Sequence, residues 1–276
     1  MSFDAIEKSS DFGAPFELYE FRYGDEDALA YRYTNADRDL TRLGHTWFAR
    51  PITREAYRSS GKTDDKSSLT IRMPVDTDLS SLFTDFPPPQ VVRVTIWAGH
   101  MTDPDEQVLV IWTGRVLSVA KERNQALLTC DNTIISLKRP GLRRNWQYLC
   151  PYVLYGPMCG ATMRGVESQV VDVTTTGIVL EAGWWGSIEP EKFKGGMIRW
   201  RGGFGLESRT IRDARDDGFL QFLGPLRDIE EGQKVSLFLG CNHTMSDCRS
   251  LHNNINNYGG DPWIPLKNPV RNHPYW

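Results

Sequence analysis

The segment at residues 90–97, Gln-Val-Val-Arg-Val-Thr-Ile-Trp, alternates apolar side chains with other residues at every second position. In an extended strand, successive side chains point to opposite faces, so Val92, Val94 and Ile96 would share one face. Such alternation is typical of a strand that buries one side in a core. We therefore expect a β-strand here, with these three side chains buried.

The same period recurs along much of the chain. Val108, Val110 and Trp112 repeat it before Gly114, and a further strand is expected over residues 125–129. Other strands are expected over residues 16–22, 29–34, 69–73, 169–174, 177–181, 196–200, 208–212, 219–223 and 235–239. Helical signal is sparse, with one short turn expected over 78–83 and one helix over 249–258. The fold class is therefore mainly β.

Length and composition limit the possible classes of protein. A chain of 276 residues has room for about two domains at roughly 150 residues each. Hydrophobic residues make up 40% and charged residues 24%, which excludes a wholly disordered chain. The net charge of −3 removes the electrostatic case for general nucleic-acid binding. No apolar stretch is long enough to span a bilayer, and the N-terminus lacks the pattern of a secretion signal.

The pattern changes after Cys159, so we expect a domain boundary near residue 160. Residues 1–160 would form an N-terminal β-rich domain and residues 161–240 a second one, each a sandwich or barrel. Residues 241–276 would be a C-terminal segment with the short helix and an extended tail. Within the second domain, the basic, glycine-rich stretch 194–205 is interpreted as a hairpin rather than a single-strand nucleic-acid site.

Four of the five cysteines form two pairs. Eight residues separate Cys150 from Cys159, and six separate Cys241 from Cys248. Cys130 stands apart at the end of an expected strand, where a lone cysteine is typically a small buried apolar residue. In a chain without a secretion signal, paired thiols indicate metal ligands, catalytic groups or inert core residues rather than disulfides.

The cysteine spacing leaves several alternatives open. Four-cysteine zinc sites use knuckles with about two to four intervening residues, which is shorter than either pair. Iron–sulfur clusters accept more varied spacing, and absence of any metal is also compatible. A catalytic thiol at Cys241 would have His243 as its base, but no third orienting group is identifiable. Motifs of nucleotide-binding loops, serine hydrolases, zinc proteases and calcium loops are absent from the sequence.

Several longer stretches resemble the phage tail-tip hub proteins, a family that includes the minor tail protein L of lambda-like phages and the hub of gene transfer agents. The two cysteine segments are the most specific part of this resemblance. The similar stretches are residues 16–21 (FELYEF), 31–39 (YRYTNADRD), 139–144 (RPGLRR), 150–160 (CPYVLYGPMCG), 240–249 (GCNHTMSDCR) and 256–265 (NNYGGDPWIP). Residues 165–239 match this family only loosely.

The resemblance implies a cofactor and a place in a virion. It implies that Cys150, Cys159, Cys241 and Cys248 hold an iron–sulfur cluster, which we expect to be [4Fe-4S]. It further implies a non-enzymatic hub that forms a trimeric ring, made in the host cytoplasm and located at the virion tail tip. Its expected partners are the distal tail protein, the central fibre or receptor-binding hub protein, and the tape measure protein. The basic segment 138–144 suits a subunit interface.

Two other functions remain as alternatives to the structural hub. The same cluster would make the chain a redox module if it transferred electrons or sensed oxidation. A four-cysteine zinc domain would instead bind nucleic acid through the basic residues 194–201. The metal content and the reversibility of reduction distinguish these alternatives.

Overall fold

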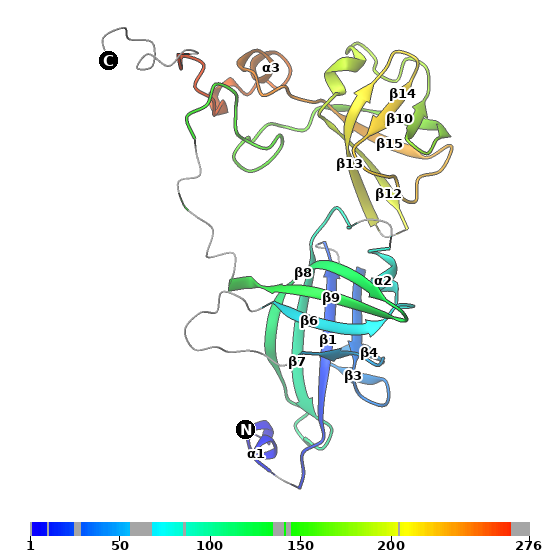
Figure 1. Cartoon of the computed structure of the whole chain (residues 1–276), viewed down its shortest axis with the longest axis vertical. Coiled ribbons are helices and arrows are strands. Elements are labelled where there is room, and N and C mark those ends of the chain that lie inside the picture. The colour runs from blue at the N-terminus through cyan, green and yellow to red at the C-terminus, as the bar shows by residue number, and fades with distance from the viewer. Residues whose placement is uncertain are drawn as a thin grey trace, which may run out of the picture. The chain divides into compact units, whose positions relative to one another are not determined.

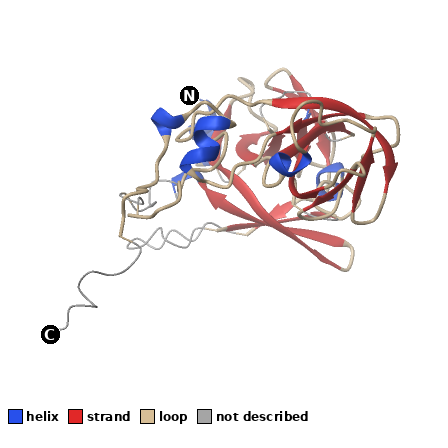
Figure 2. Cartoon of the chain, turned by 90° about the horizontal axis from the view of Figure 1, so that it is seen from above, coloured by secondary structure: helices blue, strands red, loops and turns tan. Residues whose placement is uncertain are grey.

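The computed structural model describes residues 2–9, 11–24, 29–55, 68–84, 87–134, 141, 145–203 and 205–265. The chain divides into two compact units, residues 1–139 and residues 140–276. Strands dominate the described residues, and the helices are short (Figures 1 and 2). The expectation of a mainly β chain with two β-rich parts is confirmed.

Unit 1 is built on one nine-stranded sheet. Its strand order is β3-β4-β2-β1-β7-β8-β9-β6-β5, and every neighbouring pair is antiparallel except β2 with β4. The strands are β1 (Pro15–Tyr23), β2 (Ala30–Thr34), β3 (Leu40–Arg42), β4 (His45–Ala49), β5 (Thr53–Arg54), β6 (Leu69–Pro74), β7 (Val92–His100), β8 (Val108–Glu122) and β9 (Gln125–Asn132). Two short helices accompany them, α1 (Ser2–Glu7) and α2 (Asp78–Ser81).

Strand β7 is central to this sheet, and its expected burial is confirmed. Val92, Val94 and Ile96 expose at most 1% of their surface. The expectation that Val110 and Trp112 share a face is wrong, since Trp112 is buried while Val110 is 56% exposed. The register between β7 and β8 shifts by one residue after Ile96, because β8 contains a bulge. A bulge inserts one extra residue and so reverses the alternation beyond it.

Unit 2 contains a closed six-stranded barrel in the order β10-β11-β14-β13-β12-β15. Its strands are β10 (Gly165–Val173), β11 (Gly177–Leu180), β12 (Met197–Gly202), β13 (Gly205–Ala214), β14 (Phe219–Phe222) and β15 (Lys234–Phe238), with the short helix η4 (Pro190–Phe193) between β11 and β12. The core is apolar and centres on Trp200, Phe193 and Leu237. Strands β12 and β13 pair as a hairpin from Met197↔Thr210 to Gly202↔Gly205, which confirms the hairpin interpretation of residues 194–205.

The C-terminal helix differs from the expected one. A helix over 249–258 is not formed; instead α3 spans Met245–Ser250 and a separate 3-10 turn, η5, spans Ile255–Asn257. The helix begins earlier because the Thr244 hydroxyl accepts the Asp247 backbone N–H at 3.2 Å and so caps α3. It ends before Asn253, whose φ of 49° is left-handed and incompatible with a continuing helix.

The boundary expected near residue 160 lies inside unit 2. The loop that carries Cys150 and Cys159 contacts the C-terminal segment, so it groups with the barrel and not with the sheet of unit 1. The expected interface segment 138–144 and the tail beyond residue 265 lie outside the described residues, apart from Gly141. Among the described helices, none has the length and apolar character needed to cross a membrane.

Candidate metal centre

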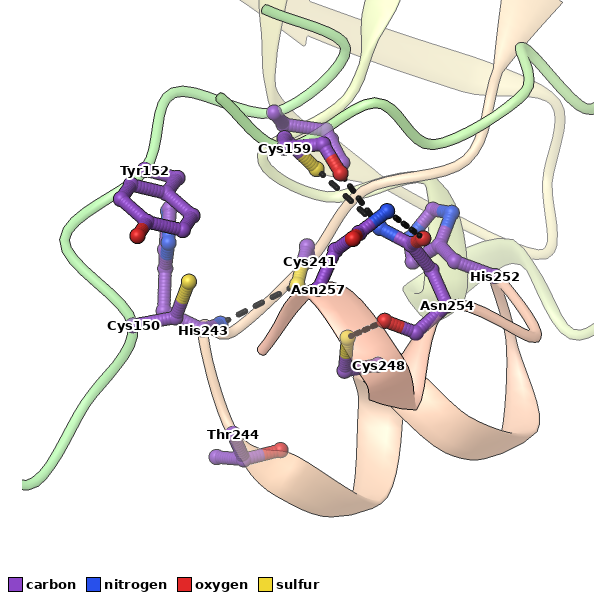
Figure 3. Close-up of a pocket in the computed structure, with 11 residues that line it drawn as sticks. Cys150, Tyr152, Cys159, Cys241, His243, Thr244, Cys248, His252, Asn254 and Asn257 are labelled. Atoms are coloured by element: carbon purple, nitrogen blue, oxygen red, sulfur yellow. Dashed lines mark hydrogen bonds between the residues drawn. The ribbon is translucent and has the colours of Figure 1, made fainter. Parts of the chain in front are cut away.

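The four paired cysteines line one cavity in unit 2. Cys150 and Cys159 lie on the cysteine loop, which we define as residues 145–164. Cys241 and Cys248 lie on the C-terminal segment, a name that from here on means residues 239–265. Figure 3 shows these two parts of the chain meeting around the thiols. The rest of the cavity wall is formed by Tyr152, Leu154, His243, Thr244, His252, Asn254 and Asn257. The structure thus brings together all four residues that the sequence singled out.

The end of the barrel positions Cys241. Strand β15 ends at Phe238, and the chain continues through Gly240, whose N–H donates to the Lys192 carbonyl at 2.8 Å. A Cβ on Gly240 would lie 1.8 Å from the Lys194 carbonyl oxygen, so only glycine fits this approach. On the other side, the Tyr155 hydroxyl of the cysteine loop donates to the Leu239 carbonyl at 2.8 Å. Cys241 is therefore held between the barrel and the cysteine loop.

Replacing Gly240 by alanine should displace Cys241. The added methyl would force the backbone away from Lys194, and overpacking of this kind costs about 1–3 kcal/mol. Denaturant unfolding and the alkylation rate of Cys241 in purified protein would measure both effects. Gly141→Ala is the matched control, because a Cβ there meets no atom within 4 Å. Equal behaviour of the two variants would contradict this account.

Helix α3 positions Cys248. The Cys248 N–H donates to the Thr244 carbonyl at 3.1 Å in the capped first turn, and its side chain is buried. The Asp247 carboxylate accepts the N–H of Asn242 at 3.0 Å, which ties the segment between Cys241 and the helix to the first turn of α3. The capping interaction therefore sets the spacing of the two C-terminal thiols.

The cysteine loop is bound to the C-terminal segment on both sides of Cys150. The Cys150 N–H donates to the His243 carbonyl at 2.9 Å, and the Tyr258 hydroxyl donates to the Tyr148 carbonyl at 3.0 Å. The ring of Tyr152 packs so closely on Gly259 that a Cβ there would lie 2.5 Å from it. Two segments about a hundred residues apart in sequence thus form one small lobe.

Three of the thiol sulfurs have N–H groups directed at them. The His243 backbone N–H points to the sulfur of Cys241 at 3.3 Å, and the Gly259 backbone N–H points to that of Cys150 at 3.4 Å. The Asn254 side-chain amide lies 3.7 Å from the sulfur of Cys159. The Cys248 thiol instead donates to the Asn254 carbonyl at 3.1 Å. N–H donors of this kind stabilise thiolate ligands of metals and clusters.

Burial controls the charge of the site. It raises the pKa of the Cys241 and Cys248 thiols, and thiolates at the other cysteines raise both pKa values further. The cavity therefore disfavours four thiolates unless a cation compensates them. Four thiols and converging N–H donors fit a thiolate-bound metal group in their chemistry. Within the described ranges, no three His, Cys, Asp or Glu side chains are arranged to hold a single metal ion.

The other residues that the sequence made candidates, Cys130, His243 and Lys194, make structural contacts in the fold. Cys130 lies fully buried in β9, where burial raises the pKa of its thiol to about 12, and it takes no part in the cavity. His243 contacts Cys241 through its backbone N–H, which is not the contact of a catalytic base. Lys194 pairs with Asp213 at 3.4 Å on the surface.

Several site residues were missed at the level of sequence. Asn254 and Gly259 both contribute to the cavity. His252 was expected from sequence only as a basic residue near the cysteines, and it hydrogen-bonds the Gly240 carbonyl at 2.9 Å. The capping residues Thr244 and Asp247 carry a readable signal, a threonine followed three residues later by an acid. The other contacts join residues far apart in sequence and have no local pattern.

Two family models match the chain. One, described as "baseplate hub protein, N-terminal attachment domain", matches residues 18–162. The other, described as "phage conserved hypothetical protein BR0599", matches residues 191–268 and so includes Cys241 and Cys248.

Two relatives extend this comparison. An uncharacterized protein of Xylella fastidiosa (strain 9a5c) is 29% identical over 150 residues, which is 50% of this chain and 30% of that protein. A chain from the structure described as the virion of a native gene transfer agent particle superposes with a TM-score of 0.77 at 17% identity. That superposition covers 98% of this chain and 94% of the other, and it establishes a shared fold.

The attachment-domain match defines the class as phage baseplate proteins. The chain belongs to the baseplate hub protein family with this N-terminal attachment domain, since the match covers more than half of it. The resemblance to tail hub proteins is thereby confirmed at the level of the family. A likeness to the lambda-like protein L stays a prediction.

Proposed function

We propose that this baseplate hub protein carries a structural iron–sulfur cluster bound by Cys150, Cys159, Cys241 and Cys248. The observation that supports it is the single cavity lined by these four thiols, with N–H groups directed at three of the sulfurs. The bound cluster would supply a cross-link between the cysteine loop and the C-terminal segment. The chain's own residues provide the ligands, the hydrogen bonds and the apolar wall.

The cross-link suits a component that carries mechanical load. In sequence, one cysteine pair precedes the barrel strands and the other follows them. A group bound by all four thiols would therefore cross-link the segment before the barrel to the segment after it. Metal binding that is specific to the folded chain adds its free energy to folding. We propose a non-enzymatic role on this basis, with the cluster stabilising the C-terminal lobe.

We further propose the place of the protein in the particle. The hub would form a trimeric ring at the tail tip of a siphophage-like virion, between the distal tail protein and the central fibre or receptor-binding hub protein, with the tape measure protein as another neighbour. Family membership supports association with other tail proteins. Cryo-electron microscopy of assembled tails should find three copies on the tail axis, and another stoichiometry would contradict the ring.

Metal analysis tests the cluster directly. Protein purified without oxygen should be brown and contain iron and acid-labile sulfide, and Cys→Ser replacement at any of the four positions should remove most of both. Cys130→Ser is the matched control and should keep them, because Cys130 lies in β9 outside the cavity. Protein without iron and sulfide would refute the cluster.

Metal content, DNA binding and redox titration together separate the two alternatives. Stoichiometric zinc in place of iron, with salt-dependent DNA binding, would favour the zinc domain that binds nucleic acid through residues 194–201. Reversible reduction at an accessible potential would favour the redox module. A cluster that stays in one oxidation state would favour the structural role.

A further inference from the structure

Asn254 is the residue through which the cysteine loop and helix α3 meet. Its side-chain Nδ2 donates to the Cys159 carbonyl at 2.7 Å and lies 3.7 Å from the Cys159 sulfur. Its backbone N–H donates to the Cys248 carbonyl at 2.9 Å, and its own carbonyl accepts the Cys248 thiol at 3.1 Å. One asparagine thus contacts both polar ends of two cysteines that lie 89 positions apart in sequence.

The orientation of this amide is fixed by its neighbour. Asn257 donates from its own Nδ2 to the Asn254 Oδ1 at 2.9 Å, and its backbone N–H donates to the Asn254 carbonyl at 3.0 Å (Figure 3). With Oδ1 occupied as an acceptor, the Nδ2 of Asn254 is the group that must face Cys159. Asn257, at the end of the 3-10 turn η5, therefore orients the Asn254 amide so that its N–H donor points at Cys159.

We propose that Asn254 is the positioning residue of this site: its side-chain amide holds Cys159 in the cavity, while its backbone holds Cys248. The inference rests on the proposed function for its purpose, since it assumes that the thiols are ligands. Its structural content does not depend on a metal. A hydrogen bond donated to a thiolate sulfur also stabilises the more negative, reduced state of an attached cluster, so the same amide would raise its reduction potential.

Thiol reactivity in the metal-free, full-length chain tests the positioning role. Asn254→Leu keeps the side chain's size and adds no charge but removes the donor to Cys159. Alkylation of Cys159 is followed site by site with mass spectrometry on the high-pH plateau, where every thiol is ionised and only its accessibility sets the rate. There it should become about five- to tenfold faster, the factor that loss of one hydrogen bond allows. Cys150 and Cys241 have other donors and should react at unchanged rates.

The matched control is Asn256→Leu, the same replacement at an exposed position in η5 that does not line the cavity. It should leave all four rates unchanged. Asn254→Asp is a second variant that keeps the polarity and shape of the side chain, and it should also release Cys159. An unchanged Cys159 rate in both variants, or an equal increase at all four thiols, would overturn the proposal.

The cluster-loaded protein gives an independent readout. Asn254→Leu should lose iron to a chelator about five- to tenfold faster than Asn256→Leu and should have a lower midpoint potential. If wild-type protein takes up no iron, the cluster proposal fails, and the alkylation rates still decide the role of Asn254. If wild-type protein holds the cluster and the two variants match in every readout, the role of Asn254 fails alone.

Discussion

Arg227→Met should destabilise the barrel of unit 2 by about 3–5 kcal/mol, the usual cost of leaving one buried charge without its partner. The Arg227 Nη2 lies 2.7 Å from Oε1 of Glu207, and Glu207 is completely buried. Arg209 approaches the other carboxylate oxygen at 3.7 Å. Removing Arg227 would leave Glu207 with this more distant cation. Chemical denaturation of the full chain would measure the loss.

Two control variants test whether burial of the ion pair causes this loss of stability. Arg215 pairs with Asp213 at 3.4 Å but is more than half exposed, so Arg215→Met should cost less than about 1 kcal/mol. The double replacement Glu207→Leu with Arg227→Met should recover part of the loss, because it removes the close pair and leaves Arg209 hydrogen-bonded to the Pro225 and Ser208 carbonyls. Equal destabilisation by the two arginine variants would show that burial of the pair is not the cause.

Cys159→Ser should release the cysteine loop from the C-terminal segment. A ligand present at about 100 times its dissociation constant raises the free energy of unfolding by about 2.7 kcal/mol. Without the proposed cluster, amide exchange in the lobe should therefore become about 100-fold faster. The affected amides would be those of the cysteine loop and α3, while the barrel strands β10–β15 keep their own hydrogen bonds. Hydrogen exchange with mass spectrometry resolves these regions.

Two comparisons accompany this experiment. Removal of the proposed cluster from wild-type protein by a chelator should give the same pattern of exchange as Cys159→Ser. Cys130→Ser should leave the lobe protected, since that thiol is buried in the sheet of unit 1. Unchanged protection of α3 in the Cys159→Ser chain would mean that hydrogen bonds alone hold the lobe together.

Most of the strands could be predicted because a strand that buries one face has apolar residues at every second position. The period identified β7 and the barrel hairpin of β12 with β13. It failed where the backbone departs from regularity, as at the bulge of β8, and it missed β3, β4 and β5, which are two to five residues long. The early start of α3 was missed because the expected helix was placed by the stop signal that follows it, Gly259, Gly260 and Pro262, and the cap at Thr244 was not considered.

The site was less accessible to sequence reasoning than the fold. Spacing identified the two cysteine pairs but left cluster, zinc and no metal open, and only the resemblance joined the pairs. Their convergence depends on contacts between segments that lie before and after the barrel in sequence, such as the Tyr155 hydroxyl with the Leu239 carbonyl. Asn254 could not be found from sequence, because its contact with Cys159 has no local signature.

The order of the cysteines along the chain has a consequence for biosynthesis. The ribosome makes Cys150 and Cys159 first, then the six barrel strands, and only then Cys241 and Cys248. In the folded chain, Cys241 reaches the cavity through Gly240, which packs beside Lys192 and Lys194. The four thiols can therefore line one cavity only after the sequence of the whole barrel has been synthesised.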